Sequence, residues 1–232
     1  MKFEATITDI ITRTSDIKSF RFNRPPGFEY KAGQYIFIKL KVNGNMVSKP
    51  FTISSSPTEK DHIEFTKKLT GHDFSNVLNS IKIGELVGIE GPYGKMTFEV
   101  EHERIALLCG GIGITPMISI CRYCTDKHLN NKITLVSSNK TEKDIIFKDE
   151  LELMQQQNDH LKVIHTLTQP TDEWGGCSGR ICEEIIVNEI FDHKNCIFYI
   201  CGSPLMVASM VSILHALMIP DQQINIENFT GY

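Results

Sequence analysis

The sequence predicts an antiparallel β-barrel followed by a parallel α/β domain, because its texture changes near residue 100. The first hundred residues alternate like strands between Gly and Pro turns, with almost no helical periodicity. The remainder alternates apolar strands with segments of helical spacing, which is typical of a parallel sheet covered on both faces. A chain of 232 residues is long enough for two small cores. We therefore predict a first domain over residues 1–99 and a second over 100–232.

The first domain contains six predicted strands and one short helix. The strands cover residues 3–12, 19–22, 34–42, 47–54, 63–69 and 86–90, and the helix covers 74–81. Asn43-Gly44, between the third and fourth strands, is a dipeptide typical of tight hairpin turns. Six short strands with this punctuation predict a closed or nearly closed barrel, of the Greek-key type.

The second domain reads as a Rossmann-like succession of strands and helices. Predicted strands cover residues 104–109, 132–137, 161–167 and 197–201, and predicted helices cover 115–126, 145–156 and 204–217. The first of these strands enters a glycine-rich turn that opens a helix, which is the arrangement of a dinucleotide-binding site.

Composition restricts the class of protein. Hydrophobic residues at 41% and charged residues at 22% describe a soluble globular chain. The N-terminus lacks the apolar stretch of a signal peptide, and the apolar runs are too short for a bilayer, so we expect a cytoplasmic protein without membrane insertion. No run of basic residues is interleaved with aromatics, which argues against nucleic acid as a partner.

The formal charge of −4 is unevenly distributed along the chain. Residues 1–99 hold 14 Lys and Arg against 11 Asp and Glu, whereas residues 100–232 hold 10 against 17. A positive first half favours a pyrophosphate cofactor or an acidic redox partner. A chance division of solvated charge explains it equally well.

All seven cysteines lie within residues 100–232. Cys121 and Cys124 have the spacing of a metal-binding pair, but they fall in a predicted helix, and no second pair completes a four-thiolate site. Iron–sulfur spacings are absent as well. We predict no metal site and interpret most of these thiols as small buried hydrophobes.

Four short motifs follow one another at spacings that suggest a common site. They are Lys49-Pro50-Phe51-Thr52-Ile53-Ser54, Gly71-His72-Asp73-Phe74-Ser75-Asn76, Gly110-Gly111-Ile112-Gly113-Ile114-Thr115-Pro116 and Cys201-Gly202-Ser203-Pro204-Leu205-Met206. In this order they resemble the ferredoxin–NADP reductase superfamily, in which an FAD-binding barrel precedes a nicotinamide-nucleotide domain. The resemblance implies hydride transfer between NADPH or NADH and FAD.

The first motif resembles the Arg-x-Tyr-Ser segment of that family. The resemblance implies that Lys49 pairs with phosphate, Phe51 stacks on the flavin and the Thr52 hydroxyl approaches flavin N5, with Pro50 and Ser54 in the same binding segment. Alternate residues of a strand point to opposite faces, so these side chains share one ligand only if it lies along the strand's edge. Lysine cannot form the bidentate pair of arginine, so the phosphate should be held more loosely.

The second and third motifs suit phosphates. The helix that begins near Phe74 and Ser75 offers unpaired N–H groups to a pyrophosphate. Just upstream, the resemblance places Lys67 near the nicotinamide nucleotide, with Thr66 in the same binding segment. His72 is interpreted as a surface residue. The third motif resembles the family's Gly-Gly-x-Gly-x-Thr-Pro turn. The resemblance implies that the nucleotide is bound by Gly110, Gly111, Gly113, Thr115 and Pro116.

The fourth motif and the C-terminus complete the predicted site. The resemblance implies that the Cys201 thiol approaches the nicotinamide and positions it, with Gly202 and Met206 in the same binding segment; simple burial of the thiol is the alternative. The closing Glu227-Asn228-Phe229 resembles the family's Glu-x-aromatic ending, whose aromatic ring covers the flavin. We assign that role to Phe229, and Tyr232 is the competing residue.

These assignments predict a flavin-dependent NAD(P)H oxidoreductase that passes electrons to a separate, ferredoxin-like protein. Lys140 and Arg180 are candidates for a 2′-phosphate contact, which favours NADPH slightly. The alternatives are an electron-transfer subunit of a larger complex, a flavin reductase that releases reduced flavin and, from another class, a regulatory or metal-binding protein.

Overall fold

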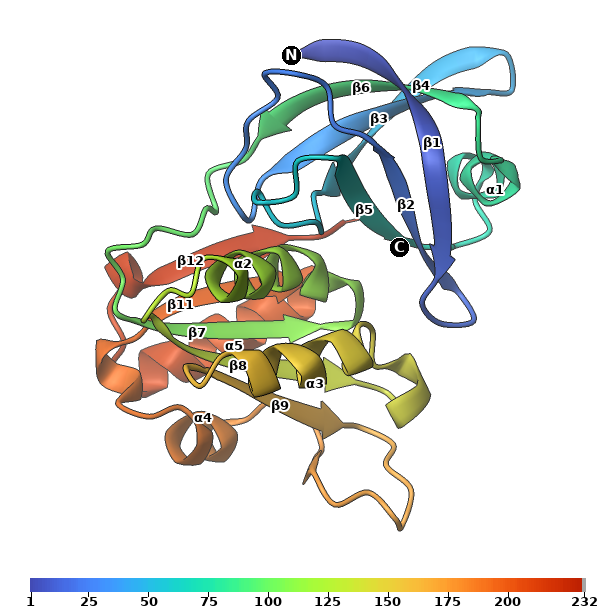
Figure 1. Cartoon of the computed structure of the whole chain (residues 1–232). Coiled ribbons are helices and arrows are strands. Elements are labelled where there is room, and N and C mark those ends of the chain that lie inside the picture. Colours follow the sequence, from blue (N-terminus) through green and yellow to red (C-terminus); the bar gives the residue numbers. More distant parts are fainter. Residues whose placement is uncertain (231–232) are drawn as a thin grey trace.

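The computed structural model describes residues 1–230 and contains two six-stranded sheets in tandem (Figure 1). The first is antiparallel, with the strand order β4-β3-β6-β1-β2-β5. Its elements are β1 (Lys2–Thr12), β2 (Ile17–Asn23), β3 (Tyr35–Val42), β4 (Asn45–Thr52), β5 (His62–Lys68), α1 (Asp73–Ser80) and β6 (Leu86–Tyr93). All six predicted strands and the predicted helix of this domain are confirmed.

The sheet curls into a barrel that closes at a short seam between β4 and β5. Just after β4, Ile53 forms an antiparallel bridge with Phe65 of β5, and the Ser54 amide donates a hydrogen bond to the Glu64 carbonyl at 2.8 Å. β4 is otherwise the terminal strand of the sheet, so its outer edge along Asn45–Thr52 pairs with no other strand within residues 1–230.

Alternation along β3 separates the barrel interior from its outer face. Ile36, Ile38 and Leu40 are buried in the barrel core, whereas Tyr35 and Phe37 lie half-buried on the opposite face. This is the period-2 pattern that a half-buried strand requires. One strand therefore supplies both apolar packing inside and aromatic surface outside.

The second sheet is parallel throughout, with the order β10-β9-β8-β7-β11-β12. Its strands are β7 (Arg104–Gly110), β8 (Lys132–Asn139), β9 (Leu161–Leu167), β10 (Cys177–Ser178), β11 (Ile197–Gly202) and β12 (Ile224–Asn228). Its helices are α2 (Ile114–Asp126), α3 (Lys148–Gln157), α4 (Glu183–Glu189) and α5 (Pro204–Ala216). The predicted Rossmann-like domain is confirmed.

Helices cover both faces of this sheet (Figure 1). Leu107 and Cys109 of β7 pack under α2 on one face, and Ala106 and Leu108 pack with α5 residues on the other. From β7 the successive strands β8, β9 and β10 are added on one side, and β11 and β12 are then added on the other side. The direction of strand addition therefore changes next to β7, and α/β sheets bind ligands at such a point. The glycine turn after β7 lies at this point.

Two strands and one α-helix of the second domain were not predicted, and one helix boundary was wrong. The additional elements are β10, α4 and the edge strand β12. The helix predicted over 145–156 begins instead at Lys148, because Phe147 before it adopts a left-handed conformation (φ 61°) that no α-helix continues through. Across residues 1–230 we find no helix with the length and apolar character needed to span a bilayer.

Candidate functional site

A cavity of about 620 Å³ lies where the barrel meets the C-terminal edge of the parallel sheet. Its walls come from β3, β4 and β5, the start of α1, the glycine turn after β7 and the segment that ends β12. The predicted residues that line it are Lys49, Pro50, Phe51, Thr52, Thr66, Lys67, Phe74, Ser75, Thr115 and Phe229. Residues separated by up to 180 positions in sequence therefore converge on one cavity.

The cavity runs along the open edge of β4. Lys49, Pro50, Phe51 and Thr52 are consecutive and all line it, which a strand permits only at its edge, as predicted. β3 contributes Tyr35, the register partner of Thr52, and Phe37, the partner of Pro50. Neither was predicted, although their alternation with buried isoleucines could have indicated that they share an outer face.

Phe51 belongs to a column of aromatic rings beside two ammonium groups. Its ring centroid lies 5.2 Å from that of Phe65 and 5.8 Å from that of Phe74, and the Lys67 Nζ lies 6.0 Å from it. Burial, assisted by the charge of Lys49, lowers the pKa of Lys67. Neither lysine forms an ion pair within residues 1–230. An aromatic wall with two mutually repelling cations fits a flavin ring and its pyrophosphate.

The hydroxyl groups around this wall differ in whether they line the cavity or are engaged in hydrogen bonds within the protein. Ser75 is buried at the start of α1, where its Oγ accepts a hydrogen bond from the Thr70 amide at 2.9 Å. Ser54 does not line the cavity: it is fully buried, donates to Glu64 Oε1 at 3.1 Å and pairs with the Thr66 hydroxyl at 2.9 Å. His72, interpreted as a surface residue, is exposed and lines the cavity rim.

The glycine turn fits closely against β11. A Cβ at Gly113 would lie 2.3 Å from the Cys201 carbonyl oxygen, so this position admits glycine alone. Gly110 and Gly202 both face Met206, whose sulfur would lie 2.7 Å from a Cβ at either position. Met206 therefore fills the space between two glycines and does not line the cavity.

The first turn of α2 follows directly. Thr115 is buried, lines the cavity and donates to the Ile112 carbonyl at 3.2 Å. Pro116 is buried in the same turn, where its missing N–H costs nothing. Gly111 has a positive φ of 50° and open space where a side chain would project, which leaves room for a phosphate to approach the backbone.

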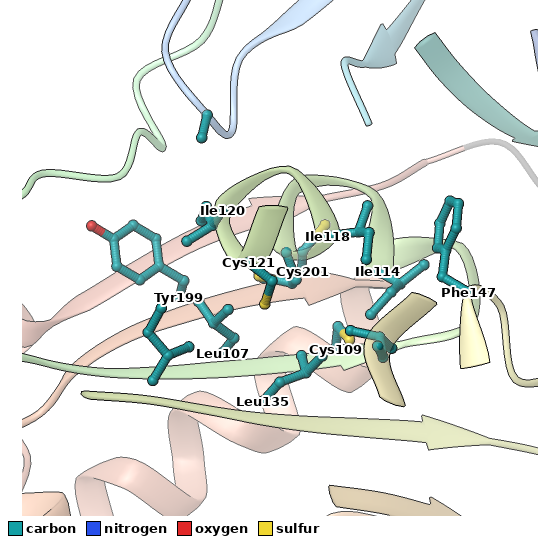
Figure 2. Close-up of a cluster of buried hydrophobic side chains, with 14 of the residues drawn as sticks. Leu107, Cys109, Ile114, Ile118, Ile120, Cys121, Leu135, Phe147, Tyr199 and Cys201 are labelled. Atoms are coloured by element: carbon teal, nitrogen blue, oxygen red, sulfur yellow. The ribbon is translucent and has the colours of Figure 1, made fainter. Parts of the chain in front are cut away.

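Cys201 lies in the apolar core under α2 (Figure 2). It is fully buried, as is its register partner Cys109 on β7. Burial, reinforced by the charge of Glu227, raises the pKa of the Cys201 thiol well above its usual range. The thiol is therefore neutral, and it lies behind the cavity wall and not on it.

Glu227 is an ionisable residue of this site for which the sequence predicted no role. It is the register partner of Cys201 on β12 and lines the cavity. Burial raises its pKa to about 7, and its Oε2 atom has no hydrogen-bond partner among residues 1–230. An unsatisfied buried carboxyl oxygen usually marks a ligand or a proton-transfer site.

Phe229 closes the cavity from the end of β12. Its amide donates to the Gly202 carbonyl at 2.9 Å, and its ring packs against the core cluster that contains Cys201. Tyr232, the competing residue, lies outside the described residues. Lys140 and Arg180 are exposed and do not line this cavity. Among residues 1–230 no cluster of His, Cys, Asp or Glu has the arrangement of a metal site.

A barrel with a flavin wall joined to a dinucleotide turn defines a flavin-dependent NAD(P)H oxidoreductase. Residues 4–98 match the family model of the oxidoreductase FAD-binding domain, and residues 107–212 match that of the oxidoreductase NAD-binding domain. The chain therefore joins an oxidoreductase FAD-binding domain to an oxidoreductase NAD-binding domain, and its cofactors are FAD and a nicotinamide nucleotide.

The chain is similar in sequence to a cytochrome b5 reductase and to a monooxygenase reductase subunit. The chain is 29% identical over 225 residues to NADH-cytochrome b5 reductase 2 of Xenopus laevis, covering 83% of this chain and 76% of that protein. It is 29% identical over 209 residues to the glycine betaine monooxygenase reductase subunit of Chromohalobacter salexigens, covering 86% of this chain and 56% of that protein. A ferredoxin NADP⁺ reductase from Neisseria gonorrhoeae, solved with FAD and NADP bound, has a TM-score of 0.84 at 21% identity, covering 98% of each chain.

Proposed function

We propose that this protein transfers a hydride from NAD(P)H to FAD in the cavity at the β4 edge and passes the electrons to a separate protein. The observation that carries the proposal is that three segments line one cavity: Lys49–Thr52 of the first motif, Thr115 after the glycine turn, and Glu227–Phe229. Bound FAD would supply the chemistry, because a flavin accepts one hydride, which carries two electrons, and can release those electrons singly.

The side chains at the β4 edge would bind different parts of FAD. Phe51 would form the wall for the flavin ring, Lys49 and Lys67 would neutralise phosphates, and the Thr52 hydroxyl would hydrogen-bond near N5. The close packing of Phe51 with Phe65 and Phe74 supports a rigid wall, which lowers the entropy lost on binding.

The residues at the ends of β11 and β12 orient the nicotinamide. Phe229, which lines the cavity, would cover the flavin face, and Cys201 in the core behind it would limit how deeply the nicotinamide enters. Glu227, with a pKa near neutrality, can hold a proton or accept a hydrogen bond from the carboxamide of the nucleotide. The shared register of Cys201 and Glu227 supports a joint role.

The nucleotide is proposed to be NADPH in preference to NADH. Lys140, exposed at the end of β8, is the candidate for the 2′-phosphate, with Arg180 as a second candidate. Steady-state kinetics with both nucleotides would test this, because Lys140→Ala should raise the KM for NADPH and leave that for NADH unchanged. A lower KM for NADH in the unmodified protein, unaffected by Lys140→Ala, would overturn the preference.

The electron acceptor is proposed to be a small acidic redox protein of the ferredoxin kind. A second candidate function is that of a reductase subunit that works only with a fixed oxygenase partner. It is favoured by the similarity to the glycine betaine monooxygenase reductase subunit. Co-purification with a constant partner would distinguish the two. A flavin reductase that releases its product is the third possibility, since Lys49 holds phosphate less firmly than arginine would.

The test of the proposed function is spectroscopic. The purified protein should be yellow with about one FAD per chain, and anaerobic addition of NADH or NADPH should bleach it. Thr52→Ala should retain FAD but slow the bleaching in stopped-flow mixing. A colourless protein that fails to take up added FAD would overturn the proposal.

A further inference from the structure

A buried carboxylate in the barrel is held by arginines from both domains. Glu64 on β5 has no solvent exposure. Its Oε2 accepts hydrogen bonds from Arg13 Nη2 at 3.1 Å and Arg21 Nε at 2.9 Å. Its Oε1 accepts one from Nη1 of Arg122, on α2 of the nucleotide domain, at 3.0 Å. Both carboxylate oxygens are thus satisfied, one of them across the domain boundary.

A second carboxylate and an aromatic ring complete this group. Glu150 on α3 pairs with Arg13 and with Arg122. The Phe147 ring lies beneath both guanidinium groups, at 4.5 Å from Arg13 Cζ and 5.1 Å from Arg122 Cζ. We call Arg13, Glu64, Arg122, Phe147 and Glu150 the interdomain clamp. It joins β5 and the end of β1 to α2 and α3.

The charges of the clamp are strongly coupled. Burial acts to raise the pKa of Glu64, but the guanidinium groups of Arg122 and Arg13 outweigh it and bring that pKa down to about 2. Burial likewise opposes the charge of Arg122, and Glu64 with Glu150 overcomes it, so the pKa of Arg122 is raised. Glu64 and Arg122 therefore stay charged at neutral pH. Removing one partner would leave a buried charge uncompensated.

The clamp connects to both halves of the reaction site. Arg122 Nη1 also donates a hydrogen bond to the Ser54 carbonyl at 2.6 Å. Ser54 lies two residues beyond Thr52, which is on the open edge of β4 that lines the cavity. The Ser54 hydroxyl in turn pairs with Thr66, which lines the cavity. At its other end, Arg122 belongs to the helix whose first turn contains Thr115 of the nucleotide turn.

We propose that the interdomain clamp sets the separation and orientation of the nicotinamide relative to the flavin, so that Arg122 and Glu64 are positioning residues for hydride transfer. The inference rests on the proposed function. Buried ion pairs add little stability compared with apolar packing, but their directional hydrogen bonds fix one register between packed elements. A displacement of about 1 Å between reacting groups can slow a reaction by about 100-fold.

The test compares three clamp variants with a matched control. Arg122→Lys keeps the charge but loses the branched guanidinium that reaches Glu64, Glu150 and the Ser54 carbonyl together. Glu64→Gln keeps the shape, and Glu150→Gln removes the partly exposed carboxylate. Lys162→Gln breaks the 2.8 Å pair with Glu189 inside the nucleotide domain, and serves as the control.

Two measurements are needed on the FAD-loaded proteins. The first is the limiting rate of flavin reduction at saturating nucleotide, with the affinities for FAD and nucleotide determined separately. We expect clamp variants to lose roughly 10- to 100-fold in rate, with both affinities within about 3-fold of the unmodified protein, and the control to be unchanged. The second is amide hydrogen exchange, which should accelerate in residues 52–58 and 115–126 and stay unchanged in β9.

The outcomes separate the clamp from the proposed function. Faster exchange with an unchanged limiting rate in Arg122→Lys would overturn the positioning role and leave a purely structural one. A reduction rate that falls only in proportion to the FAD lost from the variant would also overturn the positioning role. If Glu64→Gln does not fold, Arg122→Lys and Glu150→Gln decide. If neither nucleotide reduces the unmodified protein, the proposed function fails, and unchanged exchange in both segments would independently reject the clamp.

Discussion

At the scale of single residues, Phe51 is the side chain on which flavin binding should depend most. We expect Phe51→Ala to weaken FAD binding by ~1–3 kcal/mol, because stacking and buried apolar area are both lost. Fluorescence titration of the apoprotein with FAD measures the change. Phe191→Ala, which removes an exposed ring of the nucleotide domain, is the control. Equal affinities for the two variants would show that Phe51 is not the flavin wall.

Cys201 and Cys109 allow positioning of the nicotinamide to be separated from packing. Both thiols are fully buried on neighbouring strands in the same core cluster. Each Cys→Ala change should therefore cost a similar stability, ~1 kcal/mol for a small buried group. We expect Cys201→Ala alone to slow flavin reduction in stopped-flow mixing while nucleotide affinity is kept. If Cys109→Ala slows it equally, the role of Cys201 is packing.

The half-buried Glu227, whose Oε2 atom is shielded from solvent, should make stability depend on pH. Its folded-state pKa of about 7 lies above the ordinary value of 4.5, so the folded protein retains a proton that the unfolded chain has lost. The resulting stabilisation is full below about pH 4.5 and is lost as the pH rises through 7. Relative to Glu227→Gln, the free energy of unfolding should fall by up to ~3 kcal/mol across this window.

Urea unfolding at a series of pH values measures this dependence. Glu152→Gln, a change at a partly exposed carboxylate on α3, should follow the pH profile of the unmodified protein. A Glu227→Gln profile parallel to that of the unmodified protein would show that the carboxyl titrates normally.

Individual site residues could be predicted from sequence where they belong to a compact motif. Lys49–Thr52 form such a motif, and all four line the cavity. Arg122 and Glu64 could not be predicted, because they are 58 positions apart and meet only through the packing of α2 on the barrel. Glu227 was visible as part of a terminal motif, but its burial depends on the position of β12.

At the scale of elements, the turn between β7 and α2 should tolerate substitution very unequally. Gly113→Ala would push a Cβ to 2.3 Å from a carbonyl oxygen of β11, which should cost ~3 kcal/mol of stability and displace the nucleotide turn. Gly111→Ala meets open space and should cost ~1 kcal/mol for its positive φ. Thermal unfolding compares the two, and equal losses would contradict this geometry.

Long periodic elements were predictable, whereas short or peripheral ones were not. The eight-residue alternation of β3 and the apolar run of β7 are strong local signals. β10 has two residues, β12 has five and α4 has seven. Segments of this length form because neighbouring strands and helices cover them, so tertiary packing decides their structure and local preference does not.

At the scale of the whole molecule, the charge asymmetry should steer an acidic acceptor protein to the barrel. The rate of electron transfer to a ferredoxin should then fall as ionic strength rises beyond ~0.1 M. Reduction of a small neutral quinone should barely change in the same salt series. If the ferredoxin is reduced no faster at low salt than at high salt, electrostatic docking is excluded and the flavin assignment stands.

The lysines expected to carry this steering differ in their effective charge. Lys39 pairs with Glu90 at 2.6 Å, and Lys68 pairs with Asp16 at 3.3 Å. Lys67 lines the cavity, and Lys41 is exposed on β3. Lys41→Gln should therefore reduce the salt dependence more than Lys39→Gln does.

The open edge of β4 has a consequence for how the protein must be handled. Unpaired strand edges recruit other chains, and natural edges resist this with lysine and proline, as Lys49 and Pro50 do here. If FAD lies along this edge, the cofactor itself shields it. Flavin depletion would then leave two residues as the remaining protection of that edge. We therefore expect the apoprotein to self-associate more readily than the FAD-loaded protein.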